Sequence, residues 1–192
     1  IKNLKKPVGK QDQYLCGNSG FNSFTFYSEN GTKKNYISTI KEKVLKRLSN
    51  DFYLIPTNKN RNSDSVLKKI KNDSKSIEKI LMIREIAENF LLFNDKREYK
   101  IEEFFHSSIR DSWDIKKSLS QVMNEELEDQ FLEIKKLIPN NWIRLIGAGN
   151  GGYFLISSKL KSEELGKISS KKGIKGIFKA KLSEEGISGF QV

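Results

Sequence analysis

Four glycines lie within six residues in the segment Gly-Ala-Gly-Asn-Gly-Gly at residues 147–152. Apolar stretches at residues 143–146 and 153–157 flank this segment and are typical of strands. Glycine tolerates positive φ and lets backbone N–H groups gather around an anion. The segment therefore predicts either a tight β-hairpin or one side of a phosphate-binding loop. A Walker loop is excluded because no Gly-Lys-Ser/Thr follows. A dinucleotide fingerprint is excluded because a strand follows instead of a helix.

A second group of polar residues lies near the N-terminus, where Gln11, Asp12 and Tyr14 follow one another closely. A carboxylate exposed at the start of a helix can accept or orient the proton of an attacking hydroxyl, but Asp12 also suits an ordinary helix N-terminus. Gln11 and Tyr14 could hydrogen-bond sugar hydroxyls or simply be surface residues. Arg61 lies in a polar loop at residues 57–65. Its guanidinium could bind a substrate phosphate in bidentate fashion or be solvated.

Trp113 and Lys116 are three residues apart on a predicted helix, so they share a face. They could present an aromatic surface and a cation to a sugar phosphate, or be a core tryptophan and a surface lysine. His106 is the single histidine, which leaves no second histidine for a triad or a metal cluster. We assign no metal ligand.

The composition excludes several classes of protein. The 192 residues are 36% hydrophobic, which is enough to form a core and excludes wholesale disorder. The single cysteine, Cys16, excludes a disulfide framework and a cysteine-based zinc site and fits a reducing cytoplasm. No apolar run approaches the roughly 20 residues of a membrane span, and no signal peptide is visible. We therefore expect a cytoplasmic protein without a membrane partner.

The net charge of +11 would suit nucleic acid, because Lys and Arg neutralise phosphates. The lysines are scattered, however, and the sequence has no helix-turn-helix, zinc finger or RNP-like string. A small anionic substrate would be steered by the same positive field. We predict a small-molecule ligand and no nucleic-acid partner, and keep a basic nucleic-acid-binding module as an alternative.

Helices and strands alternate along the chain without a strict βαβ repeat, which predicts an α+β fold. An Asn30-Gly31 turn after an alternating aromatic stretch indicates a hairpin. Apolar residues at helical spacing predict amphipathic helices, including a buried stripe on the helix over residues 77–93. The expected strands cover residues 20–27, 35–38, 52–56, 143–146, 153–157, 178–182 and 188–192. The expected helices cover residues 11–17, 40–48, 77–93, 101–123 and 125–138, with another from about residue 64.

Four stretches carry a family resemblance. NWIRLIGAGNGGYFLI at residues 141–156 resembles the third, C-terminal motif of the GHMP kinases, the family of galacto-, homoserine, mevalonate and phosphomevalonate kinases. PVGKQDQYLCGNSGFN at residues 7–22 resembles the family's segment in which an Asp faces the substrate hydroxyl. FYLIPTNKNRNSDSVLK at residues 52–68 and FFHSSIRDSWDIKKSLS at residues 104–120 are similar to the D-glycero-D-manno-heptose 7-phosphate kinase branch. The resemblance spans nearly the whole chain.

The sequence departs from the family pattern at three places. Asn58 follows Thr57 where the family usually has a Thr-Gly pair, and Asn150 stands where Gly is commonest. The family's nucleotide loop, a Pro-x-x-x-Gly-Leu-Gly-Ser-Ser string, and its sugar-binding N-terminal strands would precede Ile1. The resemblance thus implies that these residues are the C-terminal part of a kinase.

The resemblance implies an ATP-dependent sugar or sugar-phosphate kinase close to the heptose 7-phosphate kinases. Its fold would be a two-layer α+β arrangement, with the end of an S5-like domain at residues 1–50 and a ferredoxin-like domain at residues 51–192. Mg²⁺ would accompany ATP, with its ligands upstream of Ile1. Partners would be a sugar or sugar phosphate, and the missing N-terminal half or a second copy. The chain alone would be inactive. A non-catalytic regulatory or interaction domain that keeps the fold remains the alternative.

The resemblance also assigns roles to individual residues, with Asp12 as the catalytic group. Substrate-binding roles fall to Gln11, Tyr14, Arg61, Trp113 and Lys116. The phosphate or nucleotide loop comprises Gly147, Ala148, Gly149, Asn150, Gly151 and Gly152.

Overall fold

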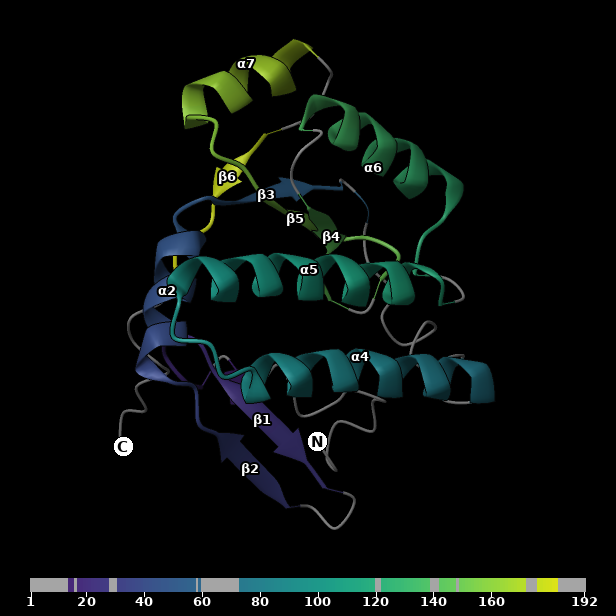
Figure 1. Ribbon diagram of the computed structural model, residues 1–192. Coiled ribbons are helices and arrows are strands. Elements are labelled where there is room, and N and C mark those ends of the chain that lie inside the picture. The colour runs from purple at the N-terminus through teal and green to yellow at the C-terminus, as the bar shows by residue number, and fades with distance from the viewer. Residues whose placement is uncertain are drawn as a thin grey trace, which may run out of the picture.

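The fold is built around one four-stranded sheet, with a separate hairpin at one side (Figure 1). The computed structural model describes residues 14–15, 17–27, 31–57, 59, 73–119, 122–138, 142–147, 149–171 and 176–182. The strands are β1 (Ser23–Phe26), β2 (Thr32–Asn35), β3 (Phe52–Pro56), β4 (Ile143–Leu145), β5 (Tyr153–Ser157) and β6 (Phe178–Lys179). The helices are α2 (Thr39–Ser49), α4 (Ser74–Leu92), α5 (Glu98–Lys117), α6 (Glu125–Leu137) and α7 (Ser162–Lys171). The predicted α+β class is confirmed.

The central sheet has the strand order β4-β5-β3-β6, and every pairing is antiparallel. Leu54 of β3 lies opposite Leu155 of β5, and Leu145 of β4 lies opposite Phe154. Because side chains alternate along a strand, each strand sends its residues to both faces of the sheet. The strand β4 forms one edge, so it can be approached both from a face and from the side.

Helices cover both faces of this sheet, as Figure 1 shows, with α6 and α7 on one face and α5 with α2 on the other. The helix α4 lies outside α5, farther from the sheet. The larger core cluster joins the α6 face of the sheet to α6 and α7, and its buried members include Ile55, Leu127, Ile134, Leu145, Phe154, Ile156 and Leu165. A second cluster on the α5 side contains Val44, Leu48, Phe52, Ile101 and Trp142. The expected two-layer arrangement is therefore too simple for the described residues.

Side-chain caps fix where three helices begin. Ser38 accepts a hydrogen bond from the Lys41 N–H at the start of α2. Asp73 caps α4, and Asn124 Oδ1 accepts from the Leu127 N–H at 2.9 Å to start α6. Such caps satisfy backbone donors that have no intrahelical partner and contribute about 1 kcal/mol each. The predicted helices over residues 40–48 and 125–138 are confirmed within a few residues.

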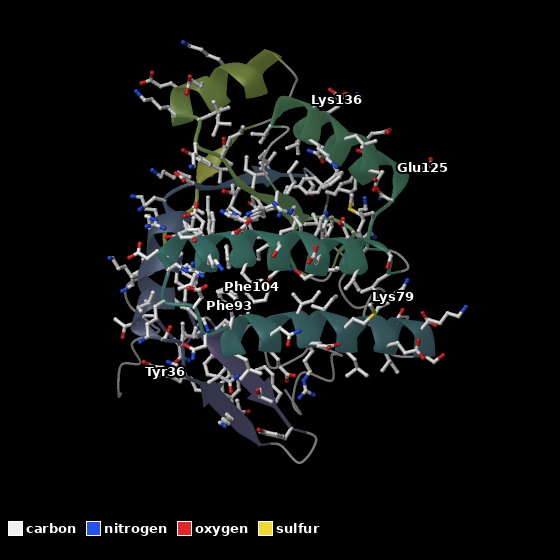
Figure 2. The ribbon with its side chains drawn as sticks, viewed as in Figure 1. Tyr36, Lys79, Phe93, Phe104, Glu125 and Lys136 are labelled. Carbon is white, nitrogen blue, oxygen red and sulfur yellow. The ribbon has the colours of Figure 1, made fainter. Side chains whose placement is uncertain are left out.

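The helix α4 differs from its prediction in what it buries. Its apolar residues were expected to form a core stripe, but Ser76 is the one buried residue recorded on α4. Phe90 packs against the second cluster, and the rings of Phe93 and Phe104 meet between α4 and α5 with centroids 4.6 Å apart (Figure 2). Five other apolar side chains of α4 are roughly half exposed or more: Ile77, Ile80, Leu81, Met82 and Leu92. The reason is that α5 covers one side of α4, while the β1–β2 hairpin faces it across a groove and covers it only in part.

Two further predictions need correction. The helix predicted over residues 101–123 ends at Lys117, because Ser118 caps it and the chain must turn to reach the Asn124 cap of α6. Leu119 and Val122 are buried in this connection instead. The strand predicted over residues 35–38 is β2, a few residues earlier, because Phe26 already pairs with Thr32.

The remaining predicted elements include two that are confirmed and two that lie outside the described residues, and one observed helix was not predicted. The helix α7 was not predicted, although Glu164 accepts from the Lys161 N–H in a cap-like contact and marks its start. The predicted strands over residues 52–56 and 153–157 are confirmed. The helix from about residue 64 and the strand over residues 188–192 lie outside the described residues. No helix in the described ranges is long and apolar enough to cross a membrane.

Candidate functional site

The glycine-rich segment forms the hairpin turn between β4 and β5, and its backbone is unusual at every described position. The φ angles are +86° at Gly147, +111° at Gly149, +55° at Asn150, +134° at Gly151 and +102° at Gly152. Side chains are disfavoured at such φ values, and Asn is among the residues that tolerate the left-handed helical region best. The backbone conformation therefore explains both the glycines and the asparagine.

Two of these glycines are also required by close packing. A Cβ at Gly149 would lie 2.8 Å from the Cα of Val122, and a Cβ at Gly151 would lie 2.9 Å from the carbonyl oxygen of Lys59. In both cases the obstacle is backbone, which cannot rotate away. The loop is thus held between the α5–α6 connection and the segment that follows β3.

Hydrogen bonds hold the loop in this position. The Asn150 N–H donates to the carbonyl of Val122 at 2.9 Å, and Asn124 Nδ2 donates to Asn150 Oδ1 at 3.3 Å. On the other side, the N–H and the hydroxyl of Thr57 both donate to the Gly152 carbonyl, at 2.9 and 3.0 Å. Asn124 therefore both caps α6 and fixes the loop.

Two buried residues of the loop have backbone donors left over. Gly149 and Gly151 are buried, and within the described part of the chain their N–H groups donate to no acceptor. Buried donors without acceptors are costly, so they favour an acceptor supplied from outside these ranges. Successive N–H groups in glycine-rich turns form concave anion sites. The loop geometry therefore fits an oxyanion such as a phosphate.

Lysines surround the loop. Lys116 Nζ donates to the Gly147 carbonyl at 2.5 Å, and Lys79 of α4 donates to the Ser118 carbonyl at 2.8 Å (Figure 2). Lys59 pairs with Glu126, and Lys117 lies 3.6 Å from Glu128. Four cations thus gather where α5 ends, α6 begins and the loop turns, and Glu126 and Glu128 offset two of them. Glu125 lies in the same first turn of α6, so the region carries charges of both signs.

Trp113 lies beside this region but faces inward. Its side chain is only 3% exposed and belongs to the larger core cluster, with its ring 6.0 Å from that of Phe131. Its indole N–H is buried and has no acceptor among the described residues. Of the two readings of the sequence, the core tryptophan is the one that this geometry favours. Lys116, on the same helix, is the residue that reaches the loop.

His106 forms a separate polar contact at the other end of β4. Trp142 Nε1 donates to His106 Nδ1 at 2.7 Å, so Nδ1 must be unprotonated and the proton of the neutral ring sits on Nε2. Burial lowers the pKa of His106, while the neighbouring Glu102 carboxylate, 3.8 Å from Nε2, acts in the opposite direction. His106 is therefore neutral near pH 7 and holds Trp142 in place.

The other predicted site residues are placed as follows. Tyr14 packs on the hairpin, with its ring 5.5 Å from Phe24 and 5.4 Å from Phe26, and none of its described contacts reaches the loop. Gln11, Asp12, Arg61 and Ala148 lie outside the described residues. Within the described ranges, no three His, Cys, Asp or Glu residues come together to hold a metal ion.

Sequence reasoning missed several residues that build this region. They are Thr57, Lys59, Lys79, Val122 and Asn124. Asn124 carried a usable signal, since Asn followed by Glu-Glu marks a helix start. The positions of the others depend on contacts between segments far apart in the sequence.

The fold resembles that of a solved structure described as a "Putative Sugar Kinase from Campylobacter jejuni", with 22% sequence identity and a TM-score of 0.50. The similarity covers 96% of this chain and 52% of that chain, so the present chain spans about half the length of the solved protein. No protein-family model and no curated protein matches the sequence. At 22% identity, the likeness shows a shared fold and leaves the activity to be argued from the site.

Proposed function

We propose that the chain is part of an ATP-dependent sugar or sugar-phosphate kinase, nearest in type to the heptose 7-phosphate kinases. The loop at residues 147–152 carries the proposal, because Gly149 and Gly151 are buried residues whose N–H groups have no described acceptor. Phosphoryl transfer depends mainly on positioning and on stabilising the charge of the phosphoryl oxygens. Backbone donors with a nearby lysine supply that stabilisation. The fold shared with a protein described as a sugar kinase supports the same reading.

In this proposal the chain's own residues have separate tasks. The amides of the loop and the ammonium of Lys116 hold phosphoryl oxygens. Asp12 accepts or orients the proton of the attacking hydroxyl, and Gln11, Tyr14 and Arg61 contribute to the sugar side, as the family resemblance implies. ATP would supply the phosphoryl group, with Mg²⁺ held by residues other than those described here.

The domain division at residue 50 and the GHMP-type arrangement belong to the same proposal. The structure adds one relevant contact, because Val44 and Leu48 of α2 share a cluster with Phe52 and Ile101. The helix α2 is therefore packed on the C-terminal unit. In this proposal the nucleotide loop is supplied by residues outside the described ranges.

Sequencing upstream of Ile1 is the first test, and a Gly-Leu-Gly-Ser-Ser string there would support the kinase. Transfer from ATP to a heptose 7-phosphate is then measured by phosphorus NMR on the full-length protein. Gly151→Ala should abolish transfer, because its Cβ meets the Lys59 carbonyl at 2.9 Å. Gly166→Ala is the matched control, since its Cβ meets nothing within 4 Å. Asp12→Asn should lose about 10²–10⁴-fold in turnover. Wild-type turnover in Asp12→Asn and Gly151→Ala would contradict the assignment.

One observation favours the alternative of a non-catalytic interaction domain. Ile80, Ile83 and Leu91 of α4 line one side of a groove of about 460 Å³. Phe24 and Phe26 of β1 line the other side. Exposed apolar surface of this kind is typical of an interface. A full-length protein that transfers no phosphoryl group yet forms a stable complex through α4 would favour this alternative over the kinase.

A further inference from the structure

Arg144, in the middle of β4, is a cation whose side chain is turned away from the sheet's main core. Its neighbours Ile143 and Leu145 both belong to the larger cluster on the α6 face. Side chains alternate along a strand, so Arg144 points to the opposite face, which α5 covers. Its cross-strand partner Leu155 confirms this direction, because Leu155 packs against the second cluster together with Ile109 of α5.

Two hydrogen bonds locate Arg144 along α5. At the start of β4, Trp142 donates to His106, and just after its end Lys116 donates to the Gly147 carbonyl. The strand and the helix therefore run side by side in the same direction. Arg144 lies between these two contacts, next to the part of α5 between His106 and Lys116. Gly147 of the loop follows three residues later, about 10 Å along the strand.

The guanidinium of Arg144 has no counter-charge in the described part of the chain. Its Nε is buried without a hydrogen-bond partner, and no described carboxylate lies within ion-pair distance. The acidic residues of α5 in this span, Asp111 and Asp114, occupy exposed positions. Burial lowers the pKa of Arg144, with no opposing charge to offset it. A buried donor on a cation that has no described partner is unfavourable, so an anion is expected to complete the site.

We infer that Arg144 binds the phosphate of a phosphorylated ligand, in a seam between β4 and α5 that leads to the glycine-rich loop. A phosphate fits better than a single backbone carbonyl, because the guanidinium fork donates two parallel hydrogen bonds to a planar or tetrahedral oxyanion. Arg144 is only half-buried as a residue, so part of it stays within reach of solvent. The inference rests on the proposed function for the identity of that ligand, the phosphate of a sugar phosphate, but its test does not require turnover.

The test is a thermal-unfolding titration with inorganic phosphate replacing chloride at constant ionic strength. Wild-type protein should show a saturable rise in Tm, and Arg144→Gln should weaken the apparent phosphate affinity at least tenfold. Arg144→Lys should bind phosphate with intermediate affinity, because lysine keeps the positive charge but lacks the two parallel donors of the guanidinium. Arg110→Gln is the matched control, since Arg110 is an exposed arginine on the adjacent helix and should leave phosphate affinity unchanged.

The Tm measured without phosphate distinguishes a ligand-binding role of Arg144 from a purely structural one. If a ligand supplies the anion, Arg144→Gln should be at least as stable as wild type in its absence, because a buried unpaired charge has been removed. A large fall in Tm for Arg144→Gln without phosphate would show that the chain itself supplies the counter-ion and would overturn the inference. Equal phosphate affinity in Arg144→Gln and wild type would also overturn it.

Two ligands distinguish the source of the phosphate. Glucose 6-phosphate and ADP are titrated separately, without Mg²⁺, into wild type and Arg144→Gln. Loss of glucose 6-phosphate binding alone supports the sugar-phosphate assignment. Loss of ADP binding alone would support an anion site at Arg144 but contradict its assignment to a sugar phosphate. Neither result depends on phosphoryl transfer, so the kinase proposal can fail while this site stands.

Discussion

Replacing Gly149 with alanine tests whether the loop is held against the α5–α6 connection. Two costs add at this position. The φ of +111° is strained for any side chain, at about 1–3 kcal/mol. The new Cβ would lie 2.8 Å from the Cα of Val122, and overpacking of this kind costs about 1–3 kcal/mol. We expect Gly149→Ala to lower the free energy of unfolding by about 2–6 kcal/mol, a large share of the about 5–15 kcal/mol typical of a domain.

Urea unfolding followed by circular dichroism measures this change, and two other glycines separate its components. Gly20 has φ +70° and open space around it, so Gly20→Ala should cost only backbone strain, about 1–2 kcal/mol. Gly166 lies in α7 with open space and no strained φ, so Gly166→Ala should stabilise by up to about 1 kcal/mol. If Gly149→Ala lowers the free energy of unfolding by no more than Gly20→Ala does, the close packing of Gly149 against Val122 is contradicted.

Three further outcomes are expected. Asn124→Ala should lower the free energy of unfolding by about 0.5–2 kcal/mol in urea, because α6 loses its cap and Asn150 loses a donor; an unchanged midpoint would contradict this role. The lowered pKa of His106 means that the unfolded chain binds its proton first, so stability should be full above the unfolded pKa of about 6.5 and fall as pH drops below it. In His106→Gln the free energy of unfolding should vary less with pH between 7.5 and 5.5 than in wild type. An equal pH dependence in both proteins would refute the assignment. Leu81→Glu on α4 should reduce self-association in light scattering, whereas Leu132→Glu on α6, also exposed, should not.

Much of the fold could be predicted because local patterns agree with it. The strand β3 is a compact apolar stretch ended by Pro56, and α6 has apolar residues at helical spacing behind an Asn cap. The end of α5 could not be predicted, because Leu119 and Val122 continue the apolar spacing although they belong to the connection. Their burial is decided by the loop packed against them, which no local pattern records.

The exposure of α4 could not be predicted for a related reason. Its apolar residues have the periodicity of a buried helix, and the sequence does not state which of its faces will be covered. In the described structure α5 packs against one side of α4, and the β1–β2 hairpin lies across a groove from another.

The candidate site was predictable in its chemistry and not in its geometry. The glycines of residues 147–152 indicated special backbone conformations, and the structure shows them. That Gly149 meets Val122 and Gly151 meets Lys59 follows from packing between segments distant in sequence. Arg144 was overlooked because an arginine inside an apolar strand has no motif of its own, and its lack of a partner is visible only in three dimensions.

The central claim is that the glycine-rich loop holds phosphoryl groups through its backbone amides, and amide chemical shifts measure this most directly. ATP with Mg²⁺ is titrated into ¹⁵N-labelled protein, and the signals of Gly149 and Gly151 are followed, with Gly166 as the internal control. Our account predicts a saturable downfield shift at both loop glycines and none at Gly166, because bound oxyanions polarise N–H groups that have no acceptor among the described residues. Unmoved Gly149 and Gly151 signals at saturating nucleotide would contradict it.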